Sequence, residues 1–110
     1  MATGDRTEKR FIGPTALSTS NTNIGFPSTG FQWTTKQFVF TNTGGTEALI
    51  YVAIGSAATA SNRVLSALPI AGNDVVVWDT ALVVETGESL YAYADRSGVN
   101  VTVMGWEKQI

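Results

Sequence analysis

Short apolar runs separated by turn signals every eight to ten residues fill the segment from Leu68 to Trp106. Such spacing is typical of small all-β domains, in which each strand is followed by a tight connection. No convincing helical period interrupts the runs. The segment therefore predicts an all-β fold, an antiparallel β-sandwich with jelly-roll-like character.

Further strands are expected upstream of this segment. The aromatic residues change parity from Phe31 and Trp33 to Phe38 and Phe40, which indicates two strands or a bulge around Thr34 to Lys36. The expected strands cover residues 31–42, 48–55, 63–70, 75–78, 81–84, 89–95 and 99–107.

Two hairpins are expected from the glycine-containing turns. The Gly-Gly pair at 44–45 supplies the positive φ angles of a tight turn, and Ser97-Gly98 forms a second tip. The expected cross-strand pairs are Phe40 with Leu49, Phe38 with Tyr51, Val39 with Ile50, Ala92 with Val103 and Ala94 with Val101. Pro69 favours an edge position for residues 63–70, because proline cannot donate into a ladder.

The second hairpin would have one small aliphatic face and one broad aromatic face. An aromatic sheet face is either half of a core or a binding surface. The run ALIYVAIG at 48–55 is apolar on both parities, which for a strand means burial on both sides. One face must then be covered by another segment or another subunit. The residues expected on the aromatic face are Tyr91, Tyr93, Thr102, Met104 and Trp106.

The first 30 residues differ in composition from the rest. They are rich in Ser, Thr, Asn and Gly, and large apolar residues such as Phe11 and Phe26 are isolated. Pro14 and Pro27 suit an extended segment outside a central ladder. We therefore expect an extended N-terminal arm over residues 1–30 and a β-sandwich domain over residues 31–110.

Composition and charge argue against several function classes. The net charge is −2 and the basic residues are scattered, so a nucleic-acid partner has little support. No apolar run approaches the roughly 20 residues that span a bilayer, so no membrane partner is expected. Histidine and cysteine are both absent, which removes the usual nucleophile and base pairs and thiolate metal ligands.

Carboxylates are the remaining candidates for chemistry. Asn73-Asp74, Glu85 and Glu88 lie on expected turns, where acidic residues commonly bond the backbone. Their spacing matches no EF-hand, and a glycosidase needs a cleft besides two acids. The sequence predicts no enzyme, no cofactor, and no metal or catalytic residues.

Aromatic side chains are the candidates for binding. Trp33, Trp78 and Trp106 could form a platform for sugar rings, which defines an alternative function in glycan recognition. Aromatic residues at strand spacing more often lie in a core or a subunit interface. The interface candidates are Phe11, Phe26, Tyr91, Tyr93, Met104 and Trp106.

Several turn motifs occur in a fixed order. VFTNTGGTEALIYVAIG precedes a small-residue connection with Asn62-Arg63, and LPIAGNDVVVWDTALVVETGESLYAYADRSGVNVTVMGWE follows it. This order, from about Gln37 to Glu107, resembles that of small bacteriophage virion proteins: an N-T-x-G turn, an I-G strand, a P-x-x-G turn, an L-V-x-E-x-G-E-x-L turn and a closing strand ending in Glu.

The resemblance implies a small β-sandwich with a structural or accessory role on the particle, at the head surface, collar or tail. Together with the apolar second face, it predicts a virion location and a capsid-decorating or head-associated protein that forms homotrimers and contacts other virion proteins such as the major capsid protein. The rival expectation is a tail or receptor-binding module that recognises host glycan through an aromatic face.

Overall fold

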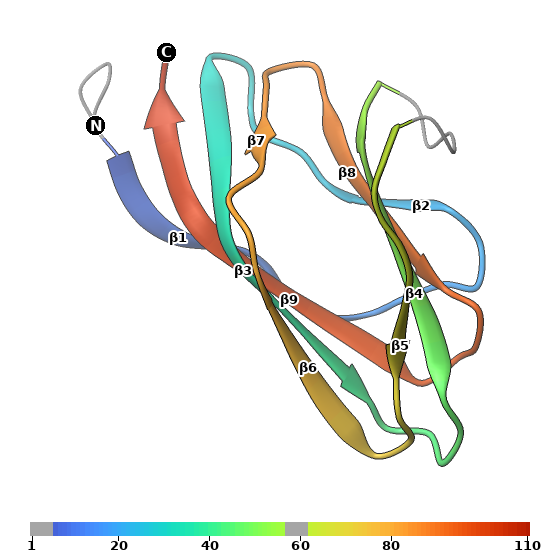
Figure 1. Ribbon diagram of the computed structural model, residues 1–110. Helices are drawn as coiled ribbons and strands as arrows, with labels where there is room; N and C mark the ends of the chain where they lie inside the picture. Colours follow the sequence, from blue (N-terminus) through green and yellow to red (C-terminus); the bar gives the residue numbers. More distant parts are fainter. Residues whose placement is uncertain (1–5, 57–61) are drawn as a thin grey trace.

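The computed structural model describes residues 6–56 and 62–110, which form two antiparallel sheets (Figure 1). Sheet A has the strand order β1-β9-β3-β6, with β7 also paired to β3, and sheet B has the order β2-β8-β4-β5. The strands are β1 (Arg6–Ala16), β2 (Thr22–Gly25), β3 (Phe31–Asn42), β4 (Ala48–Gly55), β5 (Arg63–Ile70), β6 (Asp74–Asp79), β7 (Val83–Val84), β8 (Ser89–Ala94) and β9 (Val99–Gln109). The all-β expectation is confirmed, and the fold is β-sandwich-like.

A strand is present at each position expected from residue 31 onward, but the one expected over 81–84 is shortened to Val83–Val84. The expected bulge is confirmed within β3, whose register with β9 shifts between Thr35 and Gln37. Because of this shift, Trp33 and Thr35 point to the same buried side as Phe38 and Phe40. The expected edge position of β5 is also confirmed.

The N-terminal region differs from the extended arm expected over residues 1–30. Residues 6–16 pair with β9, and residues 22–25 pair with β8, so both segments are edge strands of the two sheets. Ile12 and Leu17 lie in the core. The irregular polarity that suggested an arm has a structural cause: β1 is bulged between Arg10 and Ile12 and again before Thr15. Residues 1–5 of the expected arm lie outside the described residues.

Both expected hairpins are wrong. β3 belongs to sheet A and β4 to sheet B, and β8 and β9 are likewise divided between the sheets. The strands that we expected to pair therefore face each other across the core. Phe40 pairs with Val101 and Val76 instead of Leu49, and Ala94 pairs with Ile50 instead of Val101.

A buried asparagine stabilises the crossing of the chain between the sheets after β3. The Nδ2 atom of Asn42 donates to the carbonyl oxygens of Thr46 and Ile70, at 2.8 and 3.1 Å, and its Oδ1 accepts from the Gly44 amide. The Thr43 amide also donates to the Gly98 carbonyl oxygen. These bonds hold together the β3–β4 and β8–β9 connections and the end of β5 at one end of the molecule.

The core lies between the two sheets. Phe38 and Phe40 are fully buried from sheet A, and Ile50, Leu90 and Val52 come from sheet B. The Phe38 ring centroid lies 5.9 Å from that of Phe40 and 5.0 Å from that of Trp78. Burial of such side chains contributes roughly 1.5–3 kcal/mol each, so this layer holds the sheets together.

Candidate functional site

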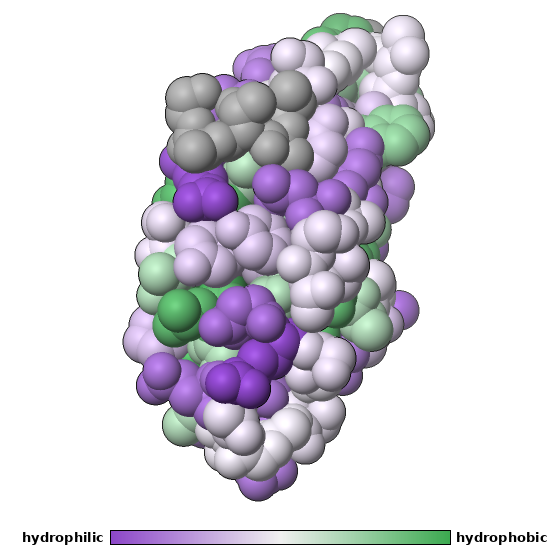
Figure 2. All heavy atoms as spheres, turned by 90° about the vertical axis from the view of Figure 1, so that its right-hand side faces the viewer, coloured by the Kyte–Doolittle hydropathy of each residue, from purple (hydrophilic) through white to green (hydrophobic). Residues whose placement is uncertain are grey.

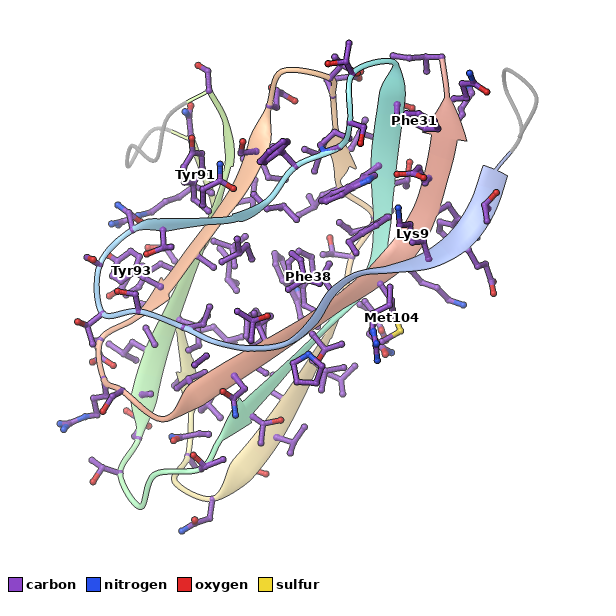
Figure 3. All side chains as sticks on the ribbon, turned by 180° about the vertical axis from the view of Figure 1, so that it is seen from behind. Lys9, Phe31, Phe38, Tyr91, Tyr93 and Met104 are labelled. Atoms are coloured by element: carbon purple, nitrogen blue, oxygen red, sulfur yellow. The ribbon has the colours of Figure 1, made fainter. Side chains whose placement is uncertain are left out.

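The predicted aromatic face is divided between two opposite sides of the molecule. Tyr91 and Tyr93 lie on the outer face of sheet B, and Met104 and Trp106 lie on the outer face of sheet A. Figure 3 shows the tyrosines and Met104 on opposite sides of the core residue Phe38. The division arises because β8 and β9 lie in different sheets instead of forming the expected hairpin. Each strand turns its outer side chains away from the shared core.

Two tyrosines and an arginine form a compact cluster on the outer face of sheet B. Tyr51 on β4 pairs with Tyr93 on β8, and their rings stack with centroids 4.5 Å apart and planes at 9°. The guanidinium carbon of Arg63 lies 4.7 Å from the Tyr51 centroid. An Arg63 N–H donates to the Tyr93 hydroxyl at 2.9 Å. We call Tyr51, Arg63 and Tyr93 the tyrosine–arginine cluster.

Sequence reasoning found one member of this cluster and missed two. The expected hairpin pairs Tyr51 with Phe38, and this pairing leaves no place for Tyr51 beside Tyr93. The useful signal was that Tyr51 and Tyr93 occupy outward positions of neighbouring strands, which becomes visible once β4 is paired with β8. Figure 2 shows this side of the molecule, where hydrophobic residues form small separate areas among pale and hydrophilic ones.

A pocket of about 360 Å³ opens on sheet A beside β1. Its lining residues come from β1, β3 and β9, and it lies beside the register shift of β3 between Thr35 and Gln37. The lining includes three cationic side chains and one acidic one, which makes the pocket cationic. The lining residues are Glu8, Lys9, Arg10, Lys36, Met104 and Gly105.

Two of these cations are held by specific contacts. The Lys9 ammonium lies 3.2 Å from a Glu107 carboxylate oxygen. The Lys36 ammonium lies 5.6 Å from the ring centroid of Trp106, within range of a cation–π interaction. The predicted interface candidates Met104 and Trp106 therefore belong to the surroundings of a cationic pocket rather than to an aromatic surface.

The opposite edge of sheet A carries exposed valines. Val75 and Val77 on β6 are each 51% exposed, and Val83 on β7 is 46% exposed. Val77 pairs with Val39 and Val83 pairs with Thr34 on β3, so the three side chains share the outer face. We call Val75, Val77 and Val83 the valine edge.

The other predicted site residues are not brought together. Phe11 stacks on Trp33 with centroids 4.3 Å apart, and Trp33 is buried and donates from Nε1 to Glu107 at 3.1 Å. Trp78 packs against Phe38 at the core. Phe26 is 62% exposed in the connection between β2 and β3. The three tryptophans considered for glycan thus lie in three different environments and form no common platform.

The acidic turn residues bond nearby groups. Asp74 accepts a hydrogen bond from the Val75 amide, Glu88 accepts one from the Glu85 amide, and Glu85 accepts two from Gln32. Within residues 6–56 and 62–110, no three His, Cys, Asp or Glu side chains are grouped as metal ligands. In the same residues, no helix is long and apolar enough to cross a membrane.

A scan against protein-family models finds no family that matches this chain. A search of curated proteins likewise finds no matching protein.

Proposed function

We propose that this chain is a structural component of a bacteriophage virion, a capsid-decorating or head-associated protein that packs on copies of itself as a homotrimer and on other virion proteins such as the major capsid protein. The valine edge carries this proposal. Three half-exposed valines lie on one outer face, two of them on the terminal strand β6 and one on β7, and they favour an interface with another protein.

The strand order supports a jelly-roll architecture, which we infer as the finer description of the fold. The chain crosses from one sheet to the other in most of its connections. The resulting strand orders are β1-β9-β3-β6 and β2-β8-β4-β5. Two interlocked Greek keys produce this arrangement, and viral capsid domains are among the proteins that use it. The inferred architecture is thus consistent with a role in a particle.

The two outer faces suit a protein that contacts more than one neighbour. Sheet A offers the valine edge and the cationic pocket, and sheet B offers the tyrosine–arginine cluster. Tyr and Arg are enriched among residues that dominate binding energy at interfaces. A decorating subunit needs one surface for its own copies and another for the underlying shell, and two separate faces meet that need.

Sedimentation of the purified protein tests the assembly. We expect a species with about three times the 11.7 kDa chain mass, in concentration-dependent exchange with the monomer. In a density gradient, the protein should also migrate with intact phage particles. The proposal would be overturned if the protein stayed monomeric at high concentration and migrated separately from the particles.

The tyrosine–arginine cluster favours glycan recognition as a second candidate function. Half-buried aromatic rings next to a hydrogen-bonding arginine are groups with which proteins hold sugar rings. This site would replace the tryptophan platform, because it stacks two aromatic side chains on one outer face.

A glycan array tests this second function. If host glycan is the ligand, Tyr93→Ala and Arg63→Ala should each lose at least about tenfold in affinity, as loss of a central contact usually does. Trp106→Ala, on the opposite face, is the matched control and should retain binding. Absence of wild-type binding across bacterial surface sugars would remove this candidate.

A further inference from the structure

The edge strands of the two sheets differ in how they are protected against pairing. β1 has two register shifts and contains Pro14. β2 is four residues long and has one shift. β5 has two shifts, contains Pro69, and holds Ala67 at a φ of 57°. Short strands, bulges and prolines are the usual features that keep an edge from adding another strand.

β6 has none of these features. Its six residues pair with β3 in one unbroken register from Asp74 to Asp79. Between those two aspartates the sequence is Val-Val-Val-Trp, without proline or charge. Among residues 6–56 and 62–110, the far side of β6 has no strand neighbour in sheet A, so its backbone can accept another strand. The outer side chains Val75 and Val77 would then gain cross-strand neighbours on the same face.

The charges argue against a second β6 as that strand. Two paired β6 strands would hold four aspartates, Asp74 and Asp79 of each copy, and no cationic side chain. No opposite charge would offset the repulsion between these carboxylates. A strand with cationic side chains fits this edge better.

The N-terminal half of β1 is such a strand. From Arg6 to Arg10 its register with β9 is continuous, so this part of the edge is regular. Lys9 and Arg10 also line the cationic pocket next to it. The successive antiparallel pairings of sheet A make β1 and β6 run in opposite directions. Two copies in the same orientation, side by side, therefore bring β6 and β1 together as an antiparallel pair.

We propose that β6 of one copy pairs with the Arg6–Arg10 segment of β1 in the next copy, an inference that rests on the proposed assembly function. The contact joins two different surfaces, so repetition closes a ring if the rotation permits. The Asp74 and Asp79 carboxylates then approach the strand that carries Lys9 and Arg10. The same contact places side chains of β1 beside the outer side chains of β6 and adds main-chain hydrogen bonds between the two edges.

Variants of each edge test the contact. Val77→Lys places a charge on β6, and Arg10→Glu reverses a charge on β1. Both side chains are exposed, so both variants should fold. Each should weaken self-association by about tenfold or more in analytical ultracentrifugation. Val64→Lys changes a valine that is 40% exposed on the protected edge β5, and it should associate like the wild type.

Mixing the two variants tests the head-to-tail geometry. Arg10→Glu keeps an intact β6 and Val77→Lys keeps an intact β1, so an equimolar mixture should form a one-to-one dimer. Absence of that dimer, or association of both variants at wild-type strength, would overturn the edge contact while the assembly function stands. A wild type that neither self-associates nor binds particles would instead contradict the proposed function.

Cysteine cross-linking gives a readout that does not depend on weakened association. The chain contains no cysteine, so introduced thiols have no native competitor. Oxidised Val77→Cys/Glu8→Cys should form a ladder of linked chains, because both positions lie on the outer face of the proposed strand pair. The single variant Val77→Cys should remain unlinked. Dimers of that single variant would indicate paired β6 strands and overturn the proposal.

Discussion

A chain that begins at residue 31 should fail to fold. The deletion removes β1 from β9 and β2 from β8, so both sheets lose an edge strand. It also removes the buried side chains of Ile12 and Leu17 and the Phe11 ring that covers Trp33. Each lost core side chain costs roughly 1.5–3 kcal/mol, and the total is comparable with the 5–15 kcal/mol that stabilises a typical domain.

Far-UV circular dichroism and thermal denaturation measure this outcome. The fragment 31–110 should show no cooperative unfolding transition. Phe26→Ser in the full-length chain is the control, because this 62%-exposed side chain should change the free energy of unfolding by only about 0.5 kcal/mol. A fragment 31–110 that unfolds cooperatively would mean that the first 30 residues are a dispensable arm.

Gly105→Ala should cost about 3 kcal/mol of unfolding free energy, at the upper end of what overpacking costs. A Cβ atom at this position would lie 2.8 Å from the Thr35 Cα and 3.0 Å from the Lys36 amide nitrogen, and it would also press on the Thr34 carbonyl oxygen. These are backbone atoms of the bulged strand β3, which cannot rotate away as a side chain can. Relief requires separation of β9 from β3 at the bulge.

Chemical denaturation compares this variant with Gly45→Ala. A Cβ atom at Gly45 meets no heavy atom within 4 Å, so this replacement should be nearly neutral. The pair of variants separates a specific backbone contact from the general effect of replacing glycine in a β protein. Equal stability of the two variants would contradict the close approach of β3 and β9 at Gly105.

For the candidate binding surfaces, the sequence predicts which side chains point outward but not which of them lie together. Tyr91, Tyr93, Met104 and Trp106 were correctly separated by parity from the small aliphatic side chains that form the core. Their grouping into one face was wrong, because alternation along a strand shows only which of its side chains share a face. It does not state which sheet the strand occupies.

The contacts of the charged residues Arg63 and Lys36 could not be predicted from the sequence either. Arg63 reaches the Tyr51 and Tyr93 rings because β5 pairs with β4 and β4 pairs with β8. Lys36 lies over Trp106 because a bulge adds one residue to β3. Both contacts join residues from distant parts of the sequence.

The sequence by itself determined the local elements from residue 31 onward. Alternating apolar residues, glycine turns and the aromatic phase change located these strands and the bulge in β3, because each of these signals acts over a few neighbouring residues. The two edge strands within the polar first 30 residues could not be predicted, because a bulged edge strand needs no regular alternation of apolar residues. Only the tertiary structure decided which strands pair, since a turn of a few residues can close a hairpin or cross to the facing sheet with similar local chemistry. That choice is made by the whole core and by the buried hydrogen bonds of Asn42, and it places the valine edge, the cationic pocket and the tyrosine–arginine cluster on the surface.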